Sequence, residues 1–310
     1  MRSKGVIFAM PWIVGLCVFT LYPFAASLYY SFTEFSVLRA PSWVGLENFT
    51  TMIHDELFFK VLHNTLFFAF MCIAGGLVVS LGLALLMNSV RRGQALYSVV
   101  LYLPHLIPAV PAALLWAWIF NGQYGLLNGF LSPFFSVLNA IRGYFNPHLA
   151  QDLLRNPDLA WGSPNWLTNW PLSSLFLVVM WGVGQTAFIY LAKLQDVPQD
   201  LYEAAEIDGA NVLQKIRHIT LPMISPIILF NVIMGIIGAL QIFTEPYLIF
   251  SDGGPNRAAY FMPQYIYDNA FRYMRMGYAC ALSWILFLII LVLTALAFRL
   301  SRDRVYYAGR

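Results

Sequence analysis

The strongest constraint on this chain is the absence of charge from six long intervals. Asp, Glu, Lys and Arg are missing from residues 5–33, 61–90, 93–141, 159–192, 218–244 and 276–298. An α-helix rises about 1.5 Å per residue and the hydrocarbon core of a bilayer is about 30 Å thick, so about 20 apolar residues cross it. Each interval is long enough, and together they exceed what one soluble core would hide. The pattern therefore predicts an integral membrane protein.

Six membrane-spanning helices are the simplest interpretation, in a single transmembrane domain that covers residues 1–310. The fold class is then an all-α integral membrane protein. The first apolar run is too long for the core of a cleavable signal peptide, so we expect it to be retained. The expected spans are roughly Val6–Phe32, Leu62–Met87, Leu96–Phe120, Leu172–Ala192, Pro222–Ile249 and Tyr278–Phe298.

The interval 93–141 does not hold two spans, because Asn121, Gly122, Gly125 and Pro133 interrupt it. Its remainder, Leu126–Ile141, is too short to cross and is predicted to be a surface or interfacial helix. It belongs to an extended external segment at about 121–171. Lys and Arg are about three times denser on the side that carries the termini, as is typical of the cytoplasm. We therefore expect both termini to be cytoplasmic.

Composition and missing motifs exclude several functions. The net charge of +3 is small and scattered, whereas nucleic-acid binding needs a concentrated basic face. The three cysteines, Cys17, Cys72 and Cys280, lie in apolar stretches with no metal or redox spacing. No lysine follows a glycine, so the chain lacks the usual phosphate-binding loop and is not expected to hydrolyse ATP itself.

The segment Lys193–Pro222 is predicted to fold as a helical hairpin at the cytoplasmic surface. Pro198 suits the first turn of a helix, Gly209 can end that helix in the left-handed conformation, and Asn211 can cap a second one. The hairpin is either an interfacial connector or a docking site for another protein. Because it holds five of the fifteen acidic residues, whereas lipid-facing connectors favour Lys and Arg, we favour docking.

The same segment resembles the EAA signature of membrane subunits in binding-protein-dependent ABC importers. The match reads Glu203-Ala204-Ala205, three residues, Gly209, nine residues, Ile219, one residue, and Leu221-Pro222. The chain is most similar to maltose-type sugar permeases. Further segments carry that resemblance, in family order: Gly45-Leu46-Glu47-Asn48-Phe49, Tyr102-Leu103-Pro104, Gln123-Tyr124-Gly125-Leu126-Leu127-Asn128, Gly253-Gly254-Pro255 and Met276-Gly277-Tyr278-Ala279.

The resemblance implies a type I ABC importer permease (MetI-like) fold in the cytoplasmic membrane of a bacterium or archaeon. The loop at about 193–222 would be the coupling helix that sits in a groove of an ATPase. The chain would hold no cofactor, since ATP and Mg are used by the separate ATPase dimer. Its other implied partners are a second permease subunit, an extracytoplasmic solute-binding protein, a carbohydrate substrate and membrane lipid. The implied coupling residues are Glu203, Ala204, Ala205, Asp208, Gly209, Ile219, Leu221 and Pro222.

Candidate path residues lie on the fourth and fifth spans. At 100° per residue, Asn231, Gly235, Gly238, Gln241 and Glu245 fall within an arc of about 120° on the fifth span. Close helix packing explains the two glycines equally well. Amide and carboxylate groups are costly in hydrocarbon, so Gln241 and Glu245 favour a path.

On the fourth span, Trp181, Gly182 and Gln185 share a face. An aromatic ring beside an amide suits a sugar, which presents both C–H faces and hydroxyls.

Three alternatives stay open. The first is import of glycerol phosphate or another polyol derivative, against which the lack of intramembrane Arg or Lys argues. The second is an ion-coupled secondary transporter, which would need Glu245 to carry protons or bind a cation. The third is an intramembrane enzyme, although the spans show no paired carboxylates, metal-spaced histidines or Ser/His pair.

Overall fold

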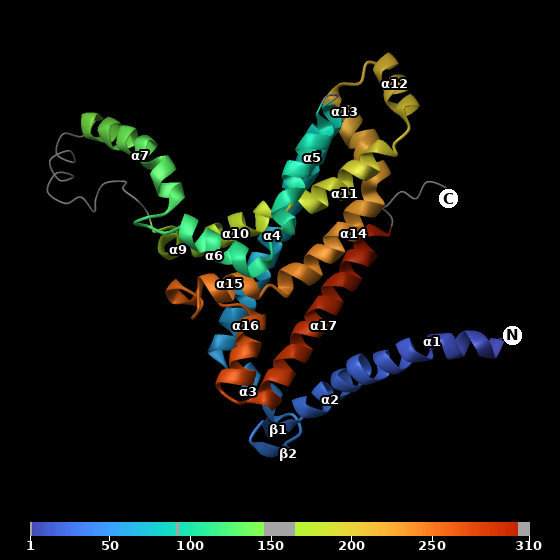
Figure 1. Ribbon diagram of the computed structural model, residues 1–310, viewed down its shortest axis with the longest axis vertical. Coiled ribbons are helices and arrows are strands. Elements are labelled where there is room, and N and C mark those ends of the chain that lie inside the picture. Colours follow the sequence, from blue (N-terminus) through green and yellow to red (C-terminus); the bar gives the residue numbers. More distant parts are fainter. Residues whose placement is uncertain (1, 91–92, 146–164, 303–310) are drawn as a thin grey trace. The chain divides into compact units, whose positions relative to one another are not determined.

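A computed structural model describes residues 2–90, 93–145 and 165–302 (Figure 1). These residues are almost entirely helical, as the sequence predicts. The exception is an antiparallel hairpin of β1 (Thr33–Ser36) and β2 (Arg39–Trp43), in which Thr33 pairs with Trp43 and Ser36 with Arg39. The charge pattern did not predict this hairpin, since it lies between spans.

The chain forms two compact units. Unit 1 comprises Met1–Thr65 and Phe261–Thr294, and unit 2 comprises Leu66–Tyr260 and Ala295–Arg310. The helices of unit 1 are α1 (Arg2–Leu16), η1 (Cys17–Leu21), α2 (Tyr22–Ser31), α3 (Glu47–Ile53), the start of α4 (Glu56–Ser89), α16 (Met262–Tyr267), η6 (Asp268–Arg272) and most of α17 (Met276–Ser301). Those of unit 2 are the rest of α4, α5 (Gln94–Tyr102), η2 (Leu103–Leu106), α6 (Ala109–Ile119), α7 (Leu126–Phe145), α9 (Trp166–Asn169), α10 (Pro171–Trp181), α11 (Gly184–Gln195), α12 (Gln199–Ile207), α13 (Val212–Lys215), η4 (Ile216–Thr220), α14 (Leu221–Leu240), α15 (Thr244–Ile249) and η5 (Pro255–Arg257).

Unit 1 packs the first span against α17. The Phe24 and Trp284 rings lie 4.7 Å apart between centroids, and Trp284 Nε1 donates a 3.2 Å hydrogen bond to Ser27 Oγ. Gly277 lets α17 touch the hairpin, because a Cβ at this position would lie 2.0 Å from the carbonyl oxygen of Thr33. The glycine of the Met276–Ala279 segment is therefore required by packing.

Four helical stretches are long and apolar enough to cross a bilayer: Phe8–Ser31, Glu56–Ser89, Val212–Ile249 and Met276–Ser301. Two bent pairs complete the predicted six if each is one span. The pairs are Gln94–Leu106 with Ala109–Ile119, bent by 97°, and Pro171–Trp181 with Gly184–Gln195, bent by 46°.

The third predicted span, Leu96–Phe120, is therefore not one straight helix. The cause lies at Pro108, which has no N–H to donate and which forces the preceding Ile107 into the extended region (ψ 125°). The fourth span bends at Gly182, between α10 and α11. Just after the bend, a Cβ on Gly184 would lie 1.8 Å from the carbonyl oxygen of Leu101, so this glycine lets α11 touch α5.

The predicted helix Leu126–Ile141 is present as α7. At its base, Trp166 Nε1 donates a 2.7 Å hydrogen bond to Asn128 Oδ1. Residues 146–164 of the predicted external segment lie outside the described residues.

Candidate coupling hairpin and transmembrane cavity

The segment 193–222 forms the predicted hairpin, which projects from one end of unit 2 between α11 and α14 in the chain order (Figure 1). Its first arm, α12, begins at Gln199, one residue later than expected, because Pro198 is the capping residue. Gly209 has φ +74° and follows the end of α12, where Ala210 N donates to the Ala205 carbonyl at 2.9 Å. The glycine ends the helix as the sequence predicts.

The second arm starts with a capping box at Asn211. Its side chain accepts from Gln214 N at 2.9 Å, and the Gln214 side chain accepts from Asn211 N at 2.8 Å. This arm is not a separate short helix. It continues from α13 through the π-helical turn η4 directly into α14.

Two side-chain contacts join the arms. Tyr202 Oη and Thr220 Oγ1 lie 3.0 Å apart, and Lys215 Nζ donates to Glu206 Oε1 at 2.6 Å. The hydrogen bond from Lys215 and its positive charge lower the pKa of the Glu206 carboxyl. Because Glu206 is exposed, we expect this ion pair to set the angle between the arms more than to stabilise the fold.

The tip of the hairpin exposes large apolar side chains among charges. Ile207, Val212 and Leu213 are 87%, 72% and 74% exposed. Such a patch, rimmed by charged residues, is typical of a surface that another protein covers. Four predicted coupling residues are exposed on the same hairpin: Glu203, Ala204, Asp208 and Gly209.

The remaining predicted coupling residues lie deeper. Ala205 is half-buried, and Leu221 and Pro222 open α14. Ile219 and Tyr202 pack against a buried cluster at the base of the hairpin, formed by Ala84, Met87, Tyr190, Leu191, Leu194, Val197 and Ile224. This cluster connects the hairpin to α4, α11 and α14.

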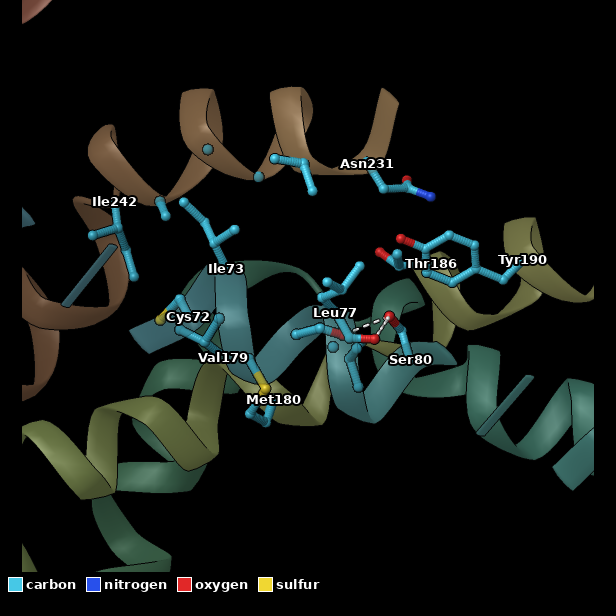
Figure 2. Close-up of a pocket in the computed structure, with 17 residues that line it drawn as sticks. Cys72, Ile73, Leu77, Ser80, Val179, Met180, Thr186, Tyr190, Asn231 and Ile242 are labelled. Carbon is cyan, nitrogen blue, oxygen red and sulfur yellow. Dashed lines mark hydrogen bonds between the residues drawn. The ribbon is translucent and has the colours of Figure 1, made fainter. Parts of the chain in front are cut away.

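A cavity of about 270 Å³ lies between α4, α10, α11 and α14 (Figure 2). Its 17 lining residues are Cys72, Ile73, Gly76, Leu77, Ser80, Val179, Met180, Gly182, Val183, Thr186, Tyr190, Asn231, Val232, Gly235, Gly238, Ala239 and Ile242. Four predicted path residues meet here: Gly182, Asn231, Gly235 and Gly238. Gly238 contributes space rather than tight packing, since a Cβ there would meet nothing within 4 Å, whereas a Cβ at Gly235 would contact Ile73 at 3.5 Å.

The other four predicted path residues do not line this cavity. The Trp181 ring instead lies edge-on to Trp116, with centroids 5.7 Å apart, and Gln185 is exposed. Gln241 and Glu245 are not on the same helical stripe as Asn231, because α14 ends at Leu240 and a new helix, α15, starts at Thr244. The 100° periodicity therefore fails beyond Leu240.

Sequence reasoning missed Ser80, Thr186 and Tyr190, the polar lining residues on α4 and α11. Thr186 and Tyr190 are four residues apart and therefore share a helix face, which was the available signal. No pattern linked that face to Asn231 on α14, since only tertiary packing brings them together.

A second polar cluster lies in unit 1 around Asp55, which precedes α4. Its carboxylate accepts hydrogen bonds from the hydroxyls of Tyr265 and Tyr278 and from Leu57 N. Burial alone would raise the pKa of Asp55, but these donors outweigh it and the pKa is lowered. The pKa of the Tyr265 hydroxyl is raised to about 12, by burial first and then by its bond to the carboxylate.

Comparison with known proteins decides the family. The sequence profile of the family described as "Binding-protein-dependent transport system inner membrane component" matches residues 76–304, which contain the hairpin and every residue that lines the cavity except Cys72 and Ile73. The chain belongs to this family. It is a subunit of a binding-protein-dependent ABC importer, a complex that also contains a binding protein and an ATPase.

Individual relatives cover nearly the whole permease. It is 34% identical over 309 residues to the "Probable ABC transporter permease protein YesP" of Bacillus subtilis (strain 168), with 99% of this chain and 93% of that protein covered. It is 30% identical over 306 residues to the "Arabinooligosaccharides transport system permease protein AraP" of the same organism, with 97% of this chain and 89% of that protein covered.

The fold also matches a solved structure. A chain of a bacterial ABC transporter involved in the import of the acidic polysaccharide alginate superposes with a TM-score of 0.78 at 24% identity, covering 97% of this permease and 96% of that chain. The predicted importer-permease fold is confirmed. The permease is a multi-pass membrane protein and a transport subunit rather than an enzyme; its family binds no cofactor, and the ATPase partner uses ATP.

Proposed function

We propose that this permease forms half of the transmembrane path of an ATP-driven importer whose solute is a carbohydrate. An extracytoplasmic binding protein delivers the solute, and a second permease subunit completes the path. An ATPase dimer docks on the coupling hairpin, 193–222, and both termini of the chain lie in the cytoplasm.

The observation that carries this proposal is the continuity between the hairpin and the cavity. The second arm of the hairpin runs without a break into α14, and α14 supplies Asn231, Gly235 and Gly238 to the cavity wall. An ATPase that moves the exposed tip therefore moves the wall of the cavity. Since Tyr202 and Thr220 tie the first arm to the same helix, both arms are expected to move together.

Carbohydrate is supported by the cavity chemistry and by the relatives. The lining combines aliphatic and glycine surface with hydroxyl and amide groups, which suits a solute that has both C–H faces and hydroxyls. The arabinooligosaccharide permease is a relative of similar length. The lining contains no carboxylate among the described residues, so an ion-coupled mechanism has no proton or cation carrier in this cavity.

The test is transport by the complete importer in proteoliposomes. The two permeases, the ATPase and the binding protein are reconstituted with ATP inside, and uptake of radiolabelled neutral saccharides, among them arabinotriose and maltotriose, is measured. We expect uptake that requires ATP and the binding protein and that an ionophore leaves unchanged. Uptake by the permeases alone, driven by an ion gradient, would contradict the proposal.

A further inference from the structure

The cavity contains two buried polar groups that lie near each other without forming a hydrogen bond of normal geometry. Tyr190 is fully buried on α11, yet its hydroxyl is unpaired, and Asn231 Nδ2 on α14 is unpaired as well. Figure 2 shows the Tyr190 hydroxyl and the Thr186 side chain on the side of the cavity that faces Asn231. Buried polar groups are almost always paired, so an unpaired donor and hydroxyl beside a cavity indicate a missing partner.

The cavity has room for a molecule that would form hydrogen bonds with Tyr190 and Asn231. Its volume of about 270 Å³ exceeds what a single water needs and approaches the lower range for small-molecule sites. Away from Tyr190, Thr186 and Asn231, the wall is formed by aliphatic side chains, Met180, Cys72, glycines and Ser80, whose hydroxyl donates to the Gly76 carbonyl. A partner that fills the space therefore has hydroxyl groups on one edge and apolar C–H surface on the other.

The charge of the molecule that would occupy the cavity follows from the residues that line it. None of the 17 lining residues is Lys, Arg, His, Asp or Glu. A phosphate or carboxylate entering this space would lose its hydration and find no counter-charge, which is strongly unfavourable. The fold is shared with a component of an importer for an acidic polysaccharide, so the fold leaves the charge of the solute open, and only the lining residues favour a neutral solute.

We propose that Tyr190 and Asn231 form a hydroxyl-binding pair for a neutral polyhydroxylated solute on its way through the permease. The Tyr190 hydroxyl and the Asn231 amide each bond one solute hydroxyl, and Thr186 borders the same site. This inference rests on the proposed function and narrows its substrate class to neutral saccharides and polyols.

The decisive variant is Tyr190→Phe, which removes one oxygen and keeps the ring in the buried cluster. Because that hydroxyl makes no hydrogen bond of normal geometry within the described protein, the melting temperature of the assembled complex should stay the same or rise. Uptake of the transported neutral saccharide at limiting concentration should fall about three- to tenfold, as expected for one lost hydrogen bond. Asn231→Leu, of nearly equal volume, should give a fall of similar size.

Tyr102→Phe is the matched control. Tyr102 is a half-buried tyrosine on α5 that does not line the cavity, so its variant should transport like wild type. A second arm supplies galacturonate and glycerol 3-phosphate to the wild-type importer, and we expect neither to be taken up.

Two outcomes would overturn the inference. One is wild-type uptake in both Tyr190→Phe and Asn231→Leu, which would mean that only water bridges the pair. The other is preferential uptake of an anionic solute by the wild-type importer. If the wild-type importer moved no saccharide with ATP, the proposed function itself would fail and the inference with it.

Discussion

The hydroxyl of Tyr278, in the first turn of α17, donates a 3.0 Å hydrogen bond to the carboxylate of Asp55, the residue that precedes α4. The two residues are 223 positions apart in sequence. Tyr265 of α16 donates to the same oxygen, and Asp55 also accepts from the first turn of α4. One side chain thus joins three helices of unit 1 at a common end.

We predict that Asp55→Asn destabilises the permease by about 1–2 kcal/mol, because an amide accepts these bonds less well than a carboxylate. The pKa of Asp55 is lowered in the folded state, so the ionised form favours folding. Its contribution is therefore present above the ordinary value of 3.8 and is lost as the pH falls through the lower folded pKa. Thermal unfolding in detergent, measured against pH, checks both effects. Glu47→Gln, at an exposed carboxylate on α3, is the control and should change neither.

Two glycine substitutions should act in opposite directions. Gly184→Ala places a Cβ 1.8 Å from the backbone of α5 and should destabilise the permease by about 3 kcal/mol or prevent its accumulation. Gly82→Ala, inside α4, meets nothing within 4 Å and should be neutral or stabilise by up to about 1 kcal/mol. Melting temperature and yield from membranes measure the difference. Equal behaviour of the two variants would show that α11 and α5 are not in contact at Gly184.

Filling the cavity should block transport without preventing assembly. Gly238→Leu has open space at its Cβ, so the new side chain enters the cavity and leaves the backbone of α14 in place. We expect the ATPase to co-purify in normal amounts while solute uptake falls at least tenfold, since the path narrows by one side chain. Gly129→Leu on α7, where a Cβ also meets nothing within 4 Å, controls for the added bulk. Normal uptake by the Gly238 variant would remove this cavity from the path.

Much of this structure could be predicted from local features of the sequence. The absence of charge identified the spans, and the hairpin followed from Pro198, Gly209 and Asn211, whose preferences act within a few residues. The bends escaped prediction although Pro104, Pro108 and Gly182 were visible, because apolar length alone does not separate a straight helix from a broken one. The end of α14 at Leu240 escaped for the same reason.

The two polar clusters depend on long-range packing and could not be predicted from spacing. Asp55 meets Tyr265 and Tyr278 only after α16 and α17 return to the start of α4, and Tyr190 meets Asn231 only after the coupling hairpin reverses the chain. Single polar residues in these segments look alike in sequence, whether they are partnered or face a cavity.

The central claim is that the coupling hairpin transmits ATPase movement to the helices around the cavity, and Gly209 tests it most directly. At φ +74°, Gly209→Val is strained by more than about 1–2 kcal/mol, whereas Gly209→Asn tolerates the left-handed conformation. The measurement is ATPase co-purification and ATP-driven uptake for both variants, inserted in membranes at equal amounts. We predict that the Val variant loses about 90% of the bound ATPase and of uptake, while the Asn variant stays near wild type. Full ATPase binding and uptake by the Val variant would contradict the account.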